Sequence, residues 1–224
     1  MTAITHPRLA ARKQGARATT WWGKAWVRAV EEAAYAEEDL VAARRLARAG
    51  LLGGIRVEPG RATVAVEDAG GLWATSVEVP ALDDDARSAL LETVAAVAGR
   101  VTALLAGDLP HELVEHAEEA GVELMPYGGE LAATCTCEAW VDPCVHALAL
   151  LQQLTWLVEA DPFVLLHLRG VPREELLAGL HAPASPRGEP GGDPDLDAAL
   201  DAAARAARFL ERLASGDTVL DHLL

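Results

Sequence analysis

The sequence is poor in the residues and segments that several protein classes require. Its 224 residues contain no asparagine, so no acceptor for N-glycosylation is present. No apolar run approaches the ~20 residues that a membrane helix needs, and the N-terminus lacks the apolar block of a secretory signal. The three cysteines all fall within ten residues, whereas a disulfide framework uses an even number spread over the fold. We therefore expect a soluble cytoplasmic protein with no membrane as partner, and a metal or redox site instead of disulfides.

Sequence patterns of common enzyme active sites are also missing. The chain has no G-x-x-x-x-G-K-[ST], no G-x-G-x-x-G and no G-x-S-x-G pattern, and it contains only four serines. Neighbouring acidic residues that could form acid–base pairs, such as Glu118 and Glu119, are explained more simply as solvated helix faces. We therefore predict that the protein is not an enzyme.

Positive charge is scarce and unevenly placed. The formal net charge is −15, and no lysine or arginine occurs between Arg100 and Arg169. The first 30 residues, in contrast, contain no acidic residue and hold six cations, namely Arg8, Arg12, Lys13, Arg17, Lys24 and Arg28. Because nucleic-acid affinity comes largely from cations that neutralise phosphates, a protein whose whole surface binds nucleic acid is excluded, whereas a basic arm on an acidic body is not.

The pattern of apolar residues indicates a mixed fold. Hydrophobic residues make up 51% of the chain, enough for a folded core. Helical spacing starts at Trp21 and continues to about residue 49, and alternating residues over 54–80 predict a small antiparallel β-meander. More helices are predicted from Asp83 to about residue 121, and an almost entirely apolar helix is predicted to open at Asp142-Pro143. The fold class is therefore α+β.

Three cysteines and one histidine form the most specific motif of the chain, Cys135-x-Cys137-x6-Cys144-x-His146. Three thiolates and one imidazole complete the tetrahedral shell that Zn²⁺ prefers. Residues two apart in a strand face the same side, so the first two cysteines can share a metal. Residues two apart in a regular helix do not, so Cys144 must lie before the first helical turn or irregularly within it. The start signal for a helix at Asp142-Pro143 places the boundary there, and the motif predicts a zinc site.

Two other interpretations of the motif are weaker. A redox pair formed by Cys135 and Cys137 leaves Cys144 and His146 unexplained, and a chance cluster of three cysteines in so short a window is rare. A catalytic zinc keeps one position open for water, which four protein ligands do not leave. The remaining histidines near the motif could replace a cysteine only after rearrangement: His111, His116 and His167. The predicted role of the metal is therefore structural, and its removal is expected to unfold at least residues 128–168.

The motif resembles the SWIM zinc finger, whose pattern is C-x-C, a variable gap and then C-x-H. Further segments are similar to bacterial SWIM-finger proteins: Trp21-Trp22-Gly23-Lys24-Ala25-Trp26, Val57-Glu58-Pro59-Gly60, Asp161-Pro162-Phe163 and Leu168-Arg169-Gly170. The resemblance covers roughly residues 20–180. It implies zinc binding and a role in binding DNA or protein, often beside a Swi/Snf-type helicase-like ATPase. Val145 stands where family members commonly carry a basic residue.

With this resemblance, the chain divides into five predicted parts. The fold is expected to comprise a helical N-terminus, a small antiparallel β-meander, a helical middle, a zinc-binding β-hairpin/helix (SWIM) unit and a C-terminal helix. The expected divisions are a basic flexible arm (1–20), an α+β N-terminal domain (21–127), a SWIM zinc-finger unit (128–181), a linker (182–194) and a C-terminal helix (195–224).

Three functions are consistent with these features. The first is a zinc-stabilised, non-enzymatic module that binds a protein, with a helicase-like ATPase as the suspected partner. The second is a nucleic-acid-binding accessory that acts through the six cations of the N-terminal arm. The third is a thiol redox sensor in which oxidation releases zinc. Trp21, Trp22 and Trp26 are predicted to pack in the core instead of stacking on bases, and Trp140 is predicted to cover the zinc site.

Overall fold

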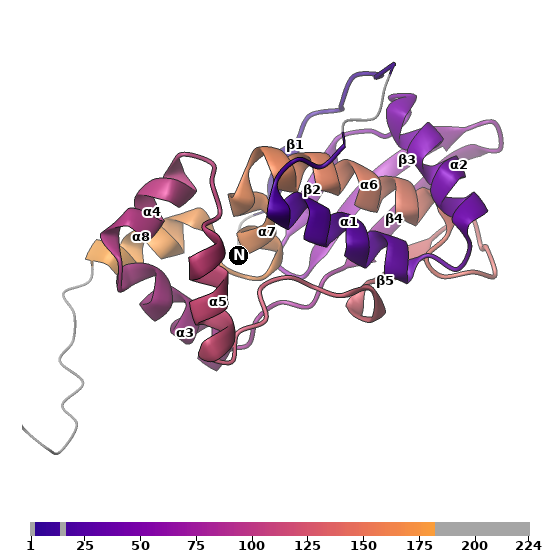
Figure 1. Ribbon diagram of the computed structural model, residues 1–224. Coiled ribbons are helices and arrows are strands. Elements are labelled where there is room, and N and C mark those ends of the chain that lie inside the picture. The colour runs from indigo at the N-terminus through magenta and orange to yellow at the C-terminus, as the bar shows by residue number, and fades with distance from the viewer. Residues whose placement is uncertain (1–2, 14–16, 182–224) are drawn as a thin grey trace, which may run out of the picture. The chain divides into compact units, whose positions relative to one another are not determined.

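Helices and one antiparallel sheet make up the chain, which Figure 1 shows as a ribbon. The computed structural model describes residues 3–13 and 17–181. The predicted linker (182–194) and C-terminal helix (195–224) lie outside the described residues. The mixture of helices with an antiparallel sheet confirms the α+β class.

The described elements follow one another in a simple order. The helices are α1 (Trp21–Ala33), α2 (Glu37–Arg48), α3 (Asp84–Ala95), α4 (Ala98–Leu105), α5 (His111–Glu119), a 3₁₀ turn η1 (Gly128–Glu130), α6 (Val145–Ala160), α7 (Pro162–Leu168) and α8 (Arg173–His181). The strands are β1 (Ile4–His6), β2 (Ile55–Glu58), β3 (Arg61–Asp68), β4 (Gly71–Glu78) and β5 (Ala132–Cys135).

The five strands form one sheet in the order β1-β2-β3-β4-β5, with every neighbouring pair antiparallel. The predicted meander corresponds to β2, β3 and β4. The cysteine segment does not form a separate hairpin, because its strand β5 pairs with β4 in a register that places Cys135 opposite Thr75. The metal motif is therefore attached to the same sheet as the N-terminal half of the chain, and residues on both sides of position 127 belong to one compact unit.

The N-terminal segment differs from the expected flexible arm. Ile4 pairs with Val57, so β1 supplies the edge strand of the sheet. The chain is held again beyond β1, where the guanidinium of Arg8 donates from Nε to the Gly50 carbonyl at 2.7 Å and the Arg12 amide donates to the Arg48 carbonyl at 2.9 Å. The difference arises because β2 would otherwise leave its backbone N–H and C=O groups unpaired along one edge, a feature that no local sequence pattern of the arm reveals.

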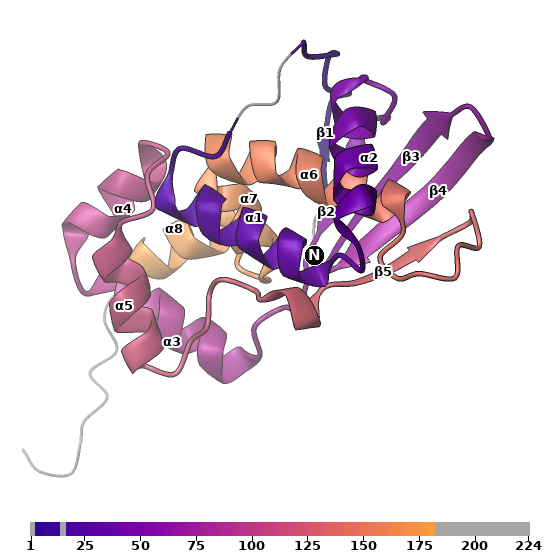
Figure 2. The same ribbon diagram turned by 45° about the vertical axis from the view of Figure 1, so that its right-hand side comes forward.

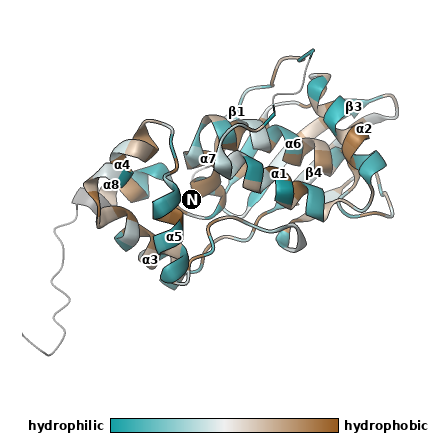
Figure 3. Cartoon of the chain, viewed as in Figure 1, coloured by the Kyte–Doolittle hydropathy of each residue, from teal (hydrophilic) through white to brown (hydrophobic). Residues whose placement is uncertain are grey.

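Helix α6 is the centre of the packing. It contacts α1, α2 and α7 as well as the sheet, and Figures 1 and 2 both show it between the other helices and the strands. Figure 3 shows hydrophobic and hydrophilic residues on different sides of α1 and α2, as expected for helices with one buried face. In contrast, α6 buries eleven of its sixteen residues. This agrees with the nearly continuous apolar sequence of α6.

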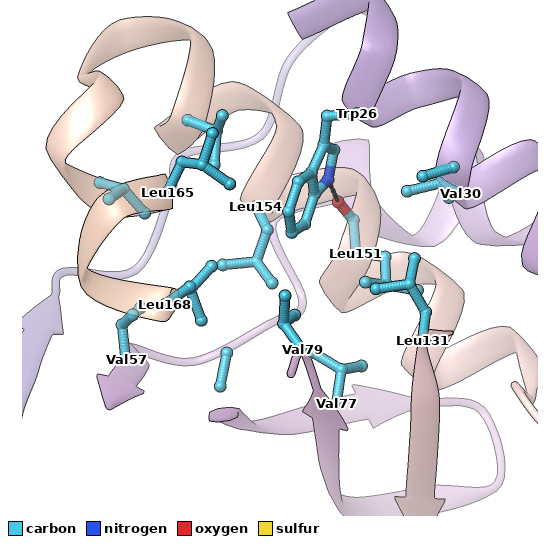
Figure 4. Packing of buried hydrophobic residues seen from close by; sticks show 14 of the residues in the cluster. Trp26, Val30, Val57, Val77, Val79, Leu131, Leu151, Leu154, Leu165 and Leu168 are labelled. Carbon is cyan, nitrogen blue, oxygen red and sulfur yellow. Dashed lines mark hydrogen bonds between the residues drawn. The ribbon is translucent and has the colours of Figure 1, made fainter. Parts of the chain in front are cut away.

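The core between α1, α6, α7 and the sheet is centred on Trp26. This side chain is fully buried and donates its indole N–H to the Leu151 carbonyl at 3.3 Å, surrounded by apolar residues of α6 and the sheet (Figure 4). The indoles of Trp21 and Trp22 also donate to backbone carbonyls, those of Leu109 and Val158. Trp22 and Trp26 are therefore buried in the core, as predicted, whereas Trp21 is half-buried and packs against the edge of the core.

Asp83 caps α3, at the position where the acidic run predicts a helix start. Its side chain accepts a hydrogen bond from the Ala86 amide at 2.8 Å. We expect Asp83→Ala to lower the free energy of unfolding by about 1 kcal/mol, because an orphan N–H of the first turn loses its acceptor. Chemical denaturation would measure the loss. The exposed Asp85 lies in the same turn without capping it, so Asp85→Ala should cost only a few tenths of a kcal/mol; equal losses would contradict the capping role.

Helices α3, α4, α5 and α8 gather at one end of the described unit (Figure 1), and α3 contacts each of the other three. Their inward residues include the buried Leu90, Val94 and Leu104. Among the described residues, no single helix has the length and apolar character to span a membrane; α3 and α4, bent by 99° at their junction, reach that length and composition only together.

Candidate metal centre

The four residues of the cysteine–histidine motif converge on one point. The ligand atoms of Cys135, Cys137, Cys144 and His146 all lie within 4.8 Å of one another. Two elements deliver them: the end of β5 with the turn that follows it, and the start of α6. The structure therefore brings together all four residues that the sequence predicts as metal ligands.

The first pair of cysteines is positioned by a tight turn at the end of β5. The strand ends at Cys135, and the Thr136 amide still donates to the Ala74 carbonyl of β4 at 3.0 Å. Glu138 then takes a positive φ of 53°, the left-handed region that a non-glycine residue seldom adopts. The chain thereby turns back, with the Glu138 amide 3.5 Å from the Cys135 carbonyl. Cys137 reaches the metal position through this turn and not through a continued strand, which is where the structure differs from the prediction.

The second pair is positioned by the start of α6. The helix begins at Val145, and Cys144 is its N-cap with an extended backbone (φ −76°, ψ 171°). The expected start at Asp142-Pro143 is two residues too early, because those residues lie in the irregular loop before the cap. The geometric requirement itself is confirmed: Cys144 precedes the first turn, so its side chain can meet that of His146, which lies within that turn.

The distances suit a zinc ion. In a tetrahedral site with Zn–S of about 2.3 Å and Zn–N of about 2.05 Å, a sulfur and a nitrogen ligand lie about 3.6 Å apart and two sulfurs about 3.8 Å apart. The Cys135 Sγ and His146 Nδ1 atoms are 3.6 Å apart. Three soft sulfur donors with one imidazole are also the donor set that zinc selects over magnesium or calcium. The residues present therefore fit zinc.

The thiols differ in their tendency to lose a proton. Burial raises the pKa of Cys144 to about 12, and the neighbouring sulfurs add to that effect. For Cys137, burial also acts upward, but hydrogen bonds from the Ala139 amide and from His146 outweigh it and lower the pKa to about 7. Because a metal binds thiolates, zinc binding at neutral pH must displace the proton of Cys144.

The carboxylate of Asp68 contacts the second ring nitrogen of His146. Its Oδ2 atom lies 2.9 Å from His146 Nε2, while Oδ1 accepts from the Trp73 indole at 2.9 Å and from the Gly70 amide at 2.8 Å. The Trp73 ring also stacks on the imidazole, with ring centres 5.8 Å apart. A proton on Nε2, shared with the carboxylate, leaves the Nδ1 lone pair directed toward the sulfurs. The turn between β3 and β4 therefore fixes both the tautomer and the orientation of the ligand.

Asp68 and Trp73 belong to the candidate site through their contacts with His146, and the sequence did not reveal them. Asp68 lies at the turn between two strands of the predicted meander, but Asp68 and His146 are 78 residues apart in the chain. A buried or metal-bound histidine needs an acceptor for its second nitrogen, which is a reason to search for a carboxylate. That reasoning does not say which of the 34 acidic residues supplies it.

The other histidines near the motif lie away from the metal position. His111 pairs with Glu115 at 3.1 Å, and His116 Nδ1 is 2.7 Å from a guanidinium nitrogen of Arg100. His167 is buried in α7. Over residues 3–13 and 17–181, the only group of cysteine, histidine or acidic side chains placed to share a metal is the predicted one. Thus none of these three histidines is placed to replace one of the four predicted metal ligands.

Trp140 does not cover the metal position, contrary to the prediction. It is 85% exposed, and its ring meets that of Tyr35 edge to face with centres 5.5 Å apart. Tyr35, in the connection between α1 and α2, is itself 72% exposed. The ligand loop from Cys137 to Cys144 bends outward, so its only aromatic residue points at a neighbouring loop and at solvent.

The predicted phosphate-binding cations have different environments. Arg8 is engaged with the Gly50 carbonyl, Arg12 lies over the Trp156 ring at 4.4 Å, and Arg28 pairs with Glu32 at 2.9 Å. Lys13 is exposed, and Arg17 and Lys24 line a cavity beside α1.

Comparison with known proteins agrees with this geometry. Residues 120–154 match the family model of the SWIM zinc finger. The uncharacterized protein Rv2102 of Mycobacterium tuberculosis is 29% identical over 171 residues, which make up 75% of this chain but only 61% of that protein. The chain thus spans less than two thirds of the length of this relative, and no solved structure matches the chain. Because the matched segment contains all four converging residues, we conclude that the chain carries a SWIM zinc finger within residues 120–154.

Proposed function

We propose that this protein is a non-enzymatic, protein-binding module in which Cys135, Cys137, Cys144 and His146 hold one structural zinc ion. The observation that carries the protein-binding role is the exposed Trp140–Tyr35 pair on the ligand loop. Large aromatic side chains dominate the energetics of protein interfaces, and leaving two of them in water is unfavourable for a surface with no partner.

The role of the metal in this proposal is to hold shape. Zinc with four protein ligands has no open position for water or substrate, so it supplies cross-linking and no Lewis-acid step. The residues of the chain do the rest: β5 and the cap of α6 present the ligands, and Asp68 orients His146. The loop that carries Trp140 is fixed at both ends, by Cys137 and by Cys144. With a metal bound, Cys137 and Cys144 would restrict the loop between them and so pre-organise Trp140 for binding.

The charge around the aromatic pair favours a basic partner surface. No lysine or arginine occurs between Arg100 and Arg169, and Glu138 and Asp142 flank Trp140 in the ligand loop. Such a loop repels polyanions and complements an apolar pocket rimmed with cations. The resemblance to bacterial SWIM-finger proteins points to a helicase-like ATPase as the partner that carries this pocket.

We expect Trp140→Ala to weaken capture of the protein partner at least tenfold without loss of zinc, because the exposed indole contributes binding area and no metal ligand. The test is affinity capture by the zinc-loaded full-length chain, followed by measurement of the affinity for the recovered partner and of the zinc content. Leu72→Ala is the matched control, since Leu72 is an apolar residue with 71% exposure near the start of β4. Equal binding by wild type and the Trp140 variant would contradict the proposed interface.

A further inference from the structure

A cationic cavity of about 480 Å³ opens beside α1, on a surface separate from the metal centre. Figures 1 and 2 both show α1, α2 and α6 side by side, and the cavity lies among these helices and the end of the N-terminal segment. Five of the residues that line it are cations: Arg17, Lys24, Arg28, Arg44 and Arg48. In a chain of net charge −15, this gathering of positive charge stands out.

Helical spacing explains how the cavity forms. Lys24, Arg28 and Glu31 follow one another at intervals of four and three residues and so share one face of α1. Arg44 and Arg48, four residues apart, share one face of α2 in the same way. The sequence shows the cations of residues 1–30 as a group, but only the packing of α2 and α1 on α6 adds the two arginines of α2.

Acidic neighbours neutralise only part of this charge. Glu31 pairs with Arg44 at 2.6 Å, and Glu32 pairs with Arg28 at 2.9 Å. Glu159 accepts hydrogen bonds from Thr19 and Thr20. Burial acts to raise the pKa of Glu159, but these hydrogen bonds and, to a smaller extent, the charge of nearby Lys24 lower it below its usual value. Within residues 3–13 and 17–181, Arg17 forms no hydrogen bond or ion pair, and Arg48 uses only its Nε, toward the Arg44 carbonyl. The cavity therefore keeps an excess of positive charge.

The wall between the cations is partly apolar. Ala18 and Val27 line it together with the amide of Gln152 and the small exposed part of Trp156, whose ring Arg12 covers on one face. The volume lies in the range of small-ligand sites, about 300–1,000 Å³, and is sufficient for one nucleotide. Guanidinium groups bind phosphate oxygens in a bidentate manner, and an apolar wall accommodates a base or a sugar.

We propose that this cavity binds one nucleotide of a single-stranded nucleic acid, with the phosphates on Arg17, Lys24 and the arginines of α2. This site goes beyond the protein-binding role of the zinc-finger loop and uses none of its residues. Single-stranded nucleic acid fits better than a duplex, because a duplex keeps its bases stacked inside and offers only a convex backbone to a hollow. Single-stranded nucleic acid also fits better than an acidic peptide, because the side chains of aspartate and glutamate have no ring that could pack against the apolar residues of the cavity.

The test measures fluorescence anisotropy of labelled 20-nucleotide single strands, DNA and RNA in separate titrations, with the zinc-loaded full-length protein between 50 and 200 mM salt. We expect micromolar affinity that falls steeply with salt. The double variant Arg17→Ala/Lys24→Ala should bind at least tenfold more weakly, and the slope of log affinity against log salt should become shallower by about 1.4. Neither side chain supports the fold through a hydrogen bond with the described residues, so circular dichroism and zinc content should stay unchanged.

The matched control is Arg56→Ala/Arg61→Ala, which removes the same charge from the sheet, where both arginines form surface ion pairs. Binding that changes less than twofold in this control supports the site. Equal losses in both double variants would overturn it, as would the absence of oligonucleotide binding. A 20-base-pair duplex that binds as tightly as the single strands would overturn the choice of ligand, and so would equal competition by polyglutamate of the same charge.

Discussion

Removal of zinc with a chelator is expected to lower the thermal midpoint of the protein by about 20 °C or more. Structural zinc contributes on the order of 10 kcal/mol, and 1 kcal/mol corresponds to roughly 2–4 °C in a chain of this size. That contribution is comparable with the whole net stability of a typical domain. The loss should also spread beyond the ligand loop, because α6 starts at the metal centre and fills the core with residues such as Leu148, Leu150 and Leu154.

Hydrogen exchange can locate this loss. Two amides report on the metal centre directly: that of Thr136, which donates to Ala74, and that of Leu148, which donates to Cys144. Protection should vanish for both on chelation and fall over residues 128–168, as the sequence predicts. The control is Cys144→Ser, which already lacks one ligand, so the chelator should change its midpoint little. A wild-type midpoint that moves by less than about 2 °C would show that zinc does not hold this fold together.

Asp68→Asn is expected to weaken zinc binding by about 10- to 100-fold, the usual effect of losing the carboxylate behind a histidine ligand. The variant loses the charge that stabilises the Nε2 proton of His146, and the amide can turn its NH₂ group toward the ring instead. Hydrogen bonds from His146, Trp73 and Gly70, in that order, lower the pKa of Asp68 to about 2. The wild-type carboxylate is therefore charged at every pH at which zinc is bound, and the comparison is cleanest near neutral pH.

Competition with a chromogenic chelator would measure the affinity, and NMR of the imidazole would report which nitrogen carries the proton. Glu67→Gln is the matched control, since it removes the same charge from the exposed neighbouring residue of β3. A merely structural role for Asp68 would lower thermal stability in zinc-free and zinc-loaded protein alike. Unchanged zinc affinity in the Asn variant would contradict the positioning role.

The sequence predicts that the four motif residues come together, and the structure confirms this convergence, because the signal for it is local. Cys135, Cys137, Cys144 and His146 lie within twelve residues, and the conformation that the last pair requires follows from helix geometry alone. The same holds for the three strands of the meander, because the alternation of residues that predicts them lies within the strands themselves. Helix α6 shows the limit of this reasoning: Asp142-Pro143 carries a good start signal, yet the helix starts at Val145 because Cys144 serves as its cap.

Features that depend on distant residues escape such reasoning. β1 and β5 are too short to be stable alone and exist because β2 and β4 offer free edges. Asp68 meets His146 only after the sheet and α6 have packed. The sequence predicts that Trp140 covers the zinc site, but its direction depends on the path of the ligand loop, which includes the positive φ of Glu138, and this conformation has no sequence signature.

X-ray absorption spectroscopy at the zinc edge tests the central claim most directly, because it counts and identifies the atoms bound to the metal in the intact protein. We predict one zinc per chain, with three sulfur atoms at about 2.3 Å and one nitrogen at about 2.0–2.1 Å. Cys144→Ser should replace one sulfur or lose the metal. A wild-type shell with an oxygen ligand in place of a sulfur, or purified and reduced protein that takes up no zinc, would contradict a closed structural site.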